Sequence, residues 1–136
     1  MKCYLGAILF VSAISPALAQ VDHGGSIGER AQFINQRNIE YARDPSLPPF
    51  HLRGVLTSAA TMELGIKKVC IEQNAVLMFH YERKSPQIIS QRALFEAEVK
   101  HFPRLYEHVR AWFRTPVLRA LYAPEAIALG VPPCRE

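Results

Sequence analysis

The sequence predicts an all-α fold: a single small bundle of four to six helices with one disulfide. Three observations lead to this prediction. Apolar residues recur at helical spacing through much of the chain, proline follows serine or threonine where helices are expected to begin, and two cysteines remain once an N-terminal leader is removed. A chain of 136 residues is long enough to bury one hydrophobic core.

The first 19 residues have the pattern of a secretory signal peptide. Lys2 supplies the positive start, an apolar run extends from Tyr4 to Ala13, and Ala17-Leu18-Ala19 provides the small residues of a cleavage site. This run is far shorter than the roughly 20 residues that a bilayer requires. We therefore expect residues 20–136 to form one exported domain, periplasmic or secreted, without a transmembrane segment in the mature chain.

Cys3 leaves with the leader, so Cys70 and Cys134 remain as a pair. In an oxidising compartment such a pair predicts a disulfide that ties the C-terminal tail to the middle of the chain. Closing so long a loop stabilises the fold by about 4 kcal/mol in the chain-entropy model. Free or metal-binding thiols are the alternative, although no histidine lies within ligand spacing of either cysteine along the chain.

Helices are expected at both ends of the mature chain. Ser26 and Glu29 have the form of a capping box, which predicts a helix over 27–43. The proline-rich connector 44–49 ends this helix, because proline removes a backbone donor and clashes with the preceding turn. A short helix is expected over 124–129, followed by an extended tail.

The middle region, residues 50–83, allows two interpretations. Nine of its side chains, most of them apolar, fall within one sector of a helical wheel. They are Val55, Ala59, Met62, Ile66, Val69, Cys70, Gln73, Leu77 and His80. This pattern favours a helix, and the all-α prediction uses it. The alternative is a short hairpin that turns at Gln73-Asn74, in which Val76–Phe79 is a strand.

Residues 85–122 are predicted to hold three successive helices. Their starts are marked by Ser85-Pro86, Pro103 and Thr115-Pro116, and the third helix is expected to end near Tyr122. In the second helix, the residues that share one face are Leu105, Val109, Trp112 and Phe113. A face of this composition is typical of a helix that packs against a core.

Gln73 and His80 are the candidate catalytic or ligand-binding residues, because both fall on the otherwise apolar face of the middle region. A partly buried imidazole needs a partner and can serve as an acid, a base or a ligand. The simpler interpretation places Gln73 at a turn and His80 at a helix end, each bonded to backbone. An enzyme centred on His80 would draw its further groups from Glu63, Glu98, His101 and His108.

The sequence carries no recognisable nucleophile or cofactor motif. There is no G-x-S-x-G elbow, and no serine, cysteine or threonine stands in a recognisable catalytic setting. A helical zinc pattern and a covalent haem-attachment motif are both missing. We therefore expect no cofactor and no metal site.

A basic and aromatic surface is predicted to contact a macromolecular partner. Arg110 and Arg114 lie four residues apart on one helix, with Tyr106 close by, and arginine beside aromatic residues is common in protein interfaces. The expected partner is another protein or an envelope component. Nucleic acid is not expected, because export removes the usual target and the mature charge is small.

The leading interpretation is therefore a non-enzymatic exported binding protein of the inhibitor, immunity or accessory-factor type. Two alternatives remain open: a ligand- or metal-binding enzyme centred on His80, and a structural subunit of an envelope assembly.

Overall fold

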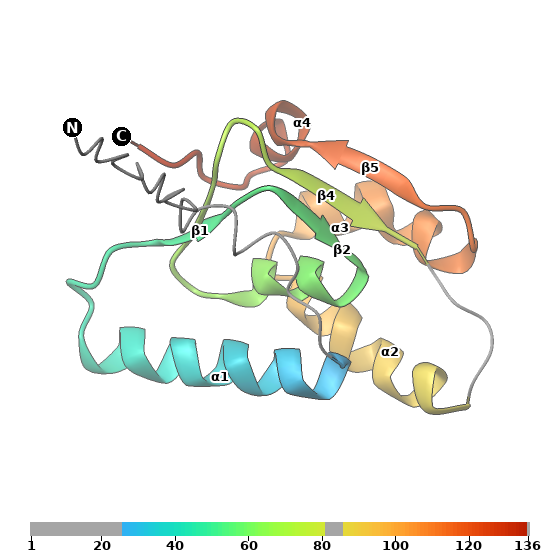
Figure 1. The fold of residues 1–136 in the computed structure, drawn as a ribbon, viewed down its shortest axis with the longest axis horizontal. Helices are drawn as coiled ribbons and strands as arrows, with labels where there is room; N and C mark the ends of the chain where they lie inside the picture. The colour runs from blue at the N-terminus through green and yellow to red at the C-terminus, as the bar shows by residue number, and fades with distance from the viewer. Residues whose placement is uncertain (1–25, 81–85, 136) are drawn as a thin grey trace, which may run out of the picture.

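The computed structural model describes residues 26–80 and 86–135, which combine helices with two small β-sheets (Figure 1). The all-α helical bundle predicted from the sequence is therefore wrong, and the fold is mixed α/β. The predicted leader, residues 1–19, lies outside the described residues, as do residues 20–25 and Ser85. Within the described ranges, no helix is both long and apolar enough to cross a membrane.

Helix α1, Ile27–Arg43, has the bounds predicted from the sequence. Ser26 caps its start: the side-chain oxygen accepts a hydrogen bond of 3.1 Å from the amide of Glu29. Asp44 caps its end, and its amide still donates to the carbonyl of Glu40. The cap thus satisfies one of the amides that a helix leaves unpaired at its start.

The middle region is not a helix but four short strands and one 3₁₀ helix. These elements are β1 (Phe50–Leu52), β2 (Val55–Thr57), η1 (Ser58–Gly65), β3 (Val69–Ile71) and β4 (Val76–Phe79). The alternative interpretation of Val76–Phe79 as a strand is confirmed. The hairpin that accompanied it is wrong, because β3 and β4 pair with other strands and not with each other.

The strands form two sheets. In the two-stranded sheet, β1 runs parallel to β3, and His51 lies opposite Cys70. In the three-stranded sheet, β4 lies between β2, to which it is parallel, and β5 (Arg119–Tyr122), to which it is antiparallel. Leu56, Leu77 and Leu121 lie side by side across these three strands and are all fully buried.

The second half of the chain is helical apart from β5. It consists of α2 (Pro86–Val99), α3 (Pro103–Val109), η2 (Arg110–Arg114), β5 and α4 (Ala123–Ala128). The helix predicted for residues 116–122 is wrong. Its last four residues pair with the edge of β4, and so short a helix has little stability of its own.

The core lies where η1 packs against α1, α2 and β4. Its fully buried members from η1 include Met62 and Leu64, and Leu105 and Val109 of α3 belong to the same core. In Figure 1, η1 lies between the sheet and the two long helices α1 and α2. Helix η1, which directly follows β2, is therefore packed between the sheet and these two helices.

The tail is attached to β3. Cys70 and Cys134 form a disulfide, the amide of Ile71 donates to the carbonyl of Pro132, and the amide of Cys134 donates to the carbonyl of Ile71. The bond closes a loop with a sequence separation of 64 residues. By chain entropy, closing this loop contributes about 4 kcal/mol of stability.

Candidate active site

The candidate site lies at one edge of the three-stranded sheet, where two parallel strands end together. The register pairs Thr57, the last residue of β2, with Met78 of β4. Ser58 follows β2 directly, and His80 follows Phe79, the last residue of β4. Because parallel strands end at the same edge, the register places a serine and a histidine that are distant in sequence at the same edge of the sheet.

Ser58 occupies a strained turn between a strand and a helix. Its φ is 54°, and it is the one non-glycine residue with a positive φ in the described ranges. A left-handed conformation costs a residue with a Cβ about 1–2 kcal/mol. The turn is fixed by the hydroxyl of Thr61, which donates a 2.6 Å hydrogen bond to the carbonyl of Ser58. A serine on such a turn has the geometry of a nucleophile elbow, although the surrounding sequence lacks the usual glycines.

Backbone amides lie directly beyond this serine. Ser58 is the first residue of η1, an eight-residue 3₁₀ helix. The first amides of a helix have no carbonyl partner within it, and they carry the positive end of its dipole. Amides in this position can stabilise an oxyanion that forms on a group bound to the serine.

His80 is half-buried and anchored through its neighbour Phe79, which is fully buried. The ring of Phe79 packs at 5.7 Å from that of Phe113 and 6.1 Å from that of Trp112. The antiparallel register pairs Phe79 with Arg119, where the ladder ends, so Leu118 comes just before β5 at the edge where His80 follows β4. The imidazole is thus carried by a rigid element of the fold.

The surroundings of this edge are apolar. Leu118 and Val117, which come just before β5, are 45% and 58% exposed. Among the described residues no hydrogen bond joins His80 to a carboxylate or to Ser58. In the described part of the chain the arrangement is therefore a serine and a histidine at one sheet edge, with no carboxylate bonded to the imidazole.

Gln73 and His80, the residues predicted as a catalytic or ligand-binding pair, do not come together. Gln73 lies in the exposed turn before β4, and His80 lies after it, at the other end of the strand. Helical spacing placed them on one face, whereas the extended chain separates them. His80 alone belongs to the candidate site.

The predicted partner-binding residues lie on α3 and η2. Arg110 and Arg114 are exposed, and Arg110 pairs with Glu107 across 3.3 Å. Tyr106 is half-buried: its hydroxyl donates to Glu96 across 3.3 Å. The two arginines thus form an open surface, while Tyr106 is held largely by contacts within the fold.

Glu63 and Glu98, the acidic residues predicted to accompany His80, pack within the fold, and no hydrogen bond seen among the described residues joins either of them to His80. Glu63 of η1 is buried and forms a 2.8 Å ion pair with Arg30 of α1. Burial raises the pKa of Glu63 to about 7, even though the charge of Arg30 acts in the opposite direction. Burial also raises the pKa of Glu98, which packs against Gly65.

A hollow of about 550 Å³ lies between α1 and β1. Its lining includes the rings of Phe33 and Phe50 and several cationic side chains. The arginines in this lining are Arg30, Arg37 and Arg53, and their ion-pair partners are Glu63, Glu40 and Glu72. Because each cation already has an acidic partner, the hollow does not define an anion site by itself.

Comparison with known proteins places the fold. No family model matches the chain, and no curated protein matches it. The fold is similar to that of a solved structure described as the "Crystal structure of the ClpP protease catalytic domain from Plasmodium falciparum", with a TM-score of 0.58 and 19% sequence identity. The match covers 79% of this chain and 59% of that chain. The fold class is thus α/β, of the kind found in a ClpP protease domain.

Sequence reasoning missed Ser58. The usual signal, a G-x-S-x-G elbow, is missing, and the strand before the serine is only three residues long. The usable signal was a serine directly after a short segment with two β-branched residues, Val55-Leu56-Thr57, and a histidine after a second apolar run.

Proposed function

We propose that this chain is a serine hydrolase in which Ser58 is the nucleophile and His80 is its general base. The observation that carries the proposal is the strained left-handed turn at Ser58, at the same sheet edge as His80. The similarity to a domain described as a protease supports the same class of reaction. The proposal replaces a catalytic pair of His80 with Gln73 by one of His80 with Ser58.

The reaction proceeds through an acyl-enzyme. The oxygen of Ser58 attacks a carbonyl carbon while His80 accepts the serine proton, and amides at the start of η1 donate to the oxygen that becomes negative. His80 then passes the proton to the leaving amine or alcohol. Water, deprotonated by the same histidine, releases the acid and restores Ser58.

The substrate is an ester or peptide with an apolar group next to the carbonyl. Val117 and Leu118 lead into β5 at this edge and expose aliphatic surface there. An apolar substituent that covers them would gain about 25 cal/mol for each Å² removed from water.

The test is hydrolysis of apolar nitrophenyl esters and end-blocked peptides by the purified chain. Loss of turnover in both Ser58→Ala and His80→Gln supports the proposal. The matched controls are Ser46→Ala, which changes an exposed serine bonded to Asp44, and His108→Gln, which changes an exposed histidine on α3. Turnover that survives Ser58→Ala in a folded protein contradicts the proposal.

The second candidate is the exported, non-enzymatic binding protein predicted from the sequence. It is favoured by the hydrogen bonds of the described residues, none of which joins His80 to a carboxylate that would orient a catalytic imidazole. In this case Arg110 and Arg114 contact the partner, and the Cys70–Cys134 disulfide suits an oxidising compartment. Co-purification of one partner that is lost on Arg110→Glu and Arg114→Glu, with no hydrolase activity, supports this candidate against the first.

A further inference from the structure

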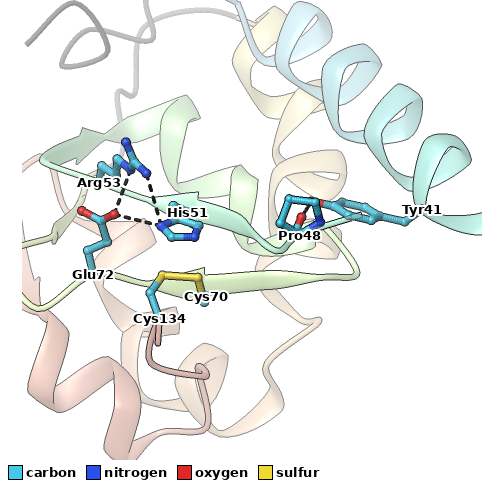
Figure 2. Close-up of a disulfide and its surroundings, with 7 residues drawn as sticks. All are labelled: Tyr41, Pro48, His51, Arg53, Cys70, Glu72 and Cys134. Carbon is cyan, nitrogen blue, oxygen red and sulfur yellow. Dashed lines mark hydrogen bonds and ion pairs between the residues drawn. A yellow bond between two sulfur atoms is a disulfide. The ribbon is translucent and has the colours of Figure 1, made fainter. Parts of the chain in front are cut away.

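We infer that reduction of the Cys70–Cys134 disulfide creates a binding site for a thiophilic divalent cation such as Zn²⁺, with His51 as the third ligand. The parallel register of β1 and β3 places His51 opposite Cys70. The disulfide brings Cys134 to the same place. One ligand atom from each of the three residues lies within 4.8 Å of the others, and Figure 2 shows the imidazole beside the two sulfurs.

The imidazole of His51 is held by an acidic neighbour. Its Nδ1 lies 2.9 Å from Oε1 of Glu72 and 3.3 Å from Nη2 of Arg53. A carboxylate can only accept, so the contact with Glu72 requires the proton on Nδ1 and leaves the lone pair on Nε2; in this tautomer Arg53 is held by its ion pair with Glu72 and makes no hydrogen bond to the ring. A carboxylate that fixes the tautomer in this way is the usual support of a metal-binding histidine. Figure 2 shows Glu72 and Arg53 together on one side of the ring.

Local charge suits a divalent cation. Arg53 forms a 2.8 Å ion pair with the carboxylate of Glu72, so the charges of these two side chains cancel. Two thiolates would add two negative charges, which a divalent cation neutralises. Two cysteines and one histidine form a set that zinc prefers, with a fourth position left open. That position has room in a hollow of about 460 Å³, whose lining includes His51, Glu72 and Cys134.

The chemistry has two balanced steps. A dithiol reductant first transfers two electrons and two protons to the disulfide, giving two protein thiols and a cyclic disulfide of the reductant. The cation then replaces the two thiol protons, which are released to solvent. The two sulfurs must move to about 3.8 Å apart to occupy neighbouring corners of a zinc tetrahedron. Cys134 can adapt because it is half-exposed and lies outside the strands.

The consequence is a tail whose covalent cross-link is lost on reduction and is replaced by a metal-mediated cross-link when the cation is present. The disulfide and the metal each close the same loop, whose sequence separation is 64 residues. The backbone hydrogen bonds that join Ile71 to Pro132 and Cys134 remain in either state and keep the ligands near one another. This inference does not depend on Ser58 or on hydrolysis.

The test is a titration of the full chain with Co²⁺, a spectroscopic substitute for Zn²⁺, after reduction with a dithiol and removal of the reductant under argon. We expect one Co²⁺ per chain, with thiolate-to-cobalt charge-transfer bands and the intense visible bands of tetrahedral cobalt. Zn²⁺ should displace it. The oxidised protein should give neither signal. Reduced protein without these bands, or oxidised protein with them, overturns the inference.

Variants separate this site from binding by cysteines alone. His51→Ala should weaken Co²⁺ binding at least tenfold and change the visible bands, and Glu72→Gln should weaken it by roughly 10- to 100-fold. His101→Ala, which changes an exposed histidine elsewhere, is the matched control and should leave binding unchanged. Equal affinity in His51→Ala and the parent chain overturns the assignment of the third ligand. If reduction unfolds the chain, Zn²⁺ must restore its near-ultraviolet circular dichroism, and failure to do so also overturns the inference.

Discussion

The buried ion pair between Arg30 and Glu63 gives a prediction whose sign separates two physical accounts. Glu63 lies in η1, five residues after Ser58, and its side chain is 1% exposed. If the attraction to Arg30 dominates, loss of the negative charge leaves a buried cation and destabilises the fold by about 3–5 kcal/mol. If desolvation dominates, as the raised pKa of Glu63 indicates, the fold is more stable above pH 7 with an uncharged side chain at position 63 than with the carboxylate.

The magnitude follows from the pKa. Its rise from 4.5 to about 7 corresponds to about 3 kcal/mol. Between these two values the folded chain holds a proton that the unfolded chain has lost, so the free energy of unfolding falls as pH rises. The stabilisation is fully present below pH 4.5 and is lost as pH passes about 7. Glu63→Gln, which imitates the protonated side chain, should therefore be more stable than the parent at pH 8, by up to about 3 kcal/mol.

The assay is urea unfolding of the oxidised protein from pH 5 to pH 8. The single tryptophan, Trp112, is half-buried against Phe79 and reports the transition by its fluorescence. We expect the two proteins to be similar at pH 5 and to diverge towards pH 8. Glu40→Gln is the control: its hydrogen bond with Arg37 lowers the pKa of Glu40, so its contribution is present above the usual pKa and lost at lower pH. A Glu63→Gln protein that is less stable than the parent at pH 8 would refute the desolvation account.

Three further predictions concern the same segment and its edge. Gly65→Ala should destabilise the fold by about 1–3 kcal/mol, because the new methyl group would lie 2.9 Å from Cβ of Glu98 and α2 would have to shift. Thermal unfolding measures this loss, and an unchanged melting temperature contradicts the close packing. Ser58→Gly should abolish hydrolysis and raise the free energy of unfolding by about 1 kcal/mol, since glycine tolerates the left-handed turn. Ser58→Ala should abolish hydrolysis without this gain in stability. Equal stability of the two variants argues against backbone strain at residue 58. Leu118→Asp puts a carboxylate just before β5, at the edge where His80 follows β4, and should raise kcat/KM about tenfold or more by orienting the imidazole. A folded variant with unchanged kinetics contradicts the expectation that the two side chains meet.

Several helix boundaries could be predicted from local signals in the sequence. The cap at Ser26 and Glu29 and the prolines that follow Arg43 fix both ends of α1, because they act within one turn of the helix. The prolines at the starts of α2 and α3 mark where those two helices begin. These signals need no knowledge of the rest of the chain.

The sheets could not be predicted in this way. Strands β1 to β4 have three or four residues each, too few for alternation to stand out in the sequence. In β3 all three residues are buried, so alternation is lost there altogether. The apolar residues of these four strands also fit a helical wheel by chance. Parallel partners such as Val55 and Val76 lie far apart in sequence, and no local pattern reports their pairing.

The candidate site depends on this pairing more than on any motif. His80 could be singled out as a polar residue in an apolar region, but its partner could not, because Ser58 reaches it only through the parallel register of β2 and β4. His51 was missed as a neighbour of Cys70 for the same reason. In both cases the chemistry comes from strands that are distant in sequence and adjacent in space.

The reactivity of Ser58 can be measured directly with an apolar alkyl fluorophosphonate, which forms a stable adduct only with an activated serine. Mass spectrometry of the digested protein should locate the adduct on Ser58, and His80→Gln should slow its formation at least about 100-fold, since a general base contributes 10²–10⁴. Ser46→Ala should react like the parent. An unlabelled Ser58, or labelling at the same rate without His80, would contradict the pairing of these two residues at the sheet edge.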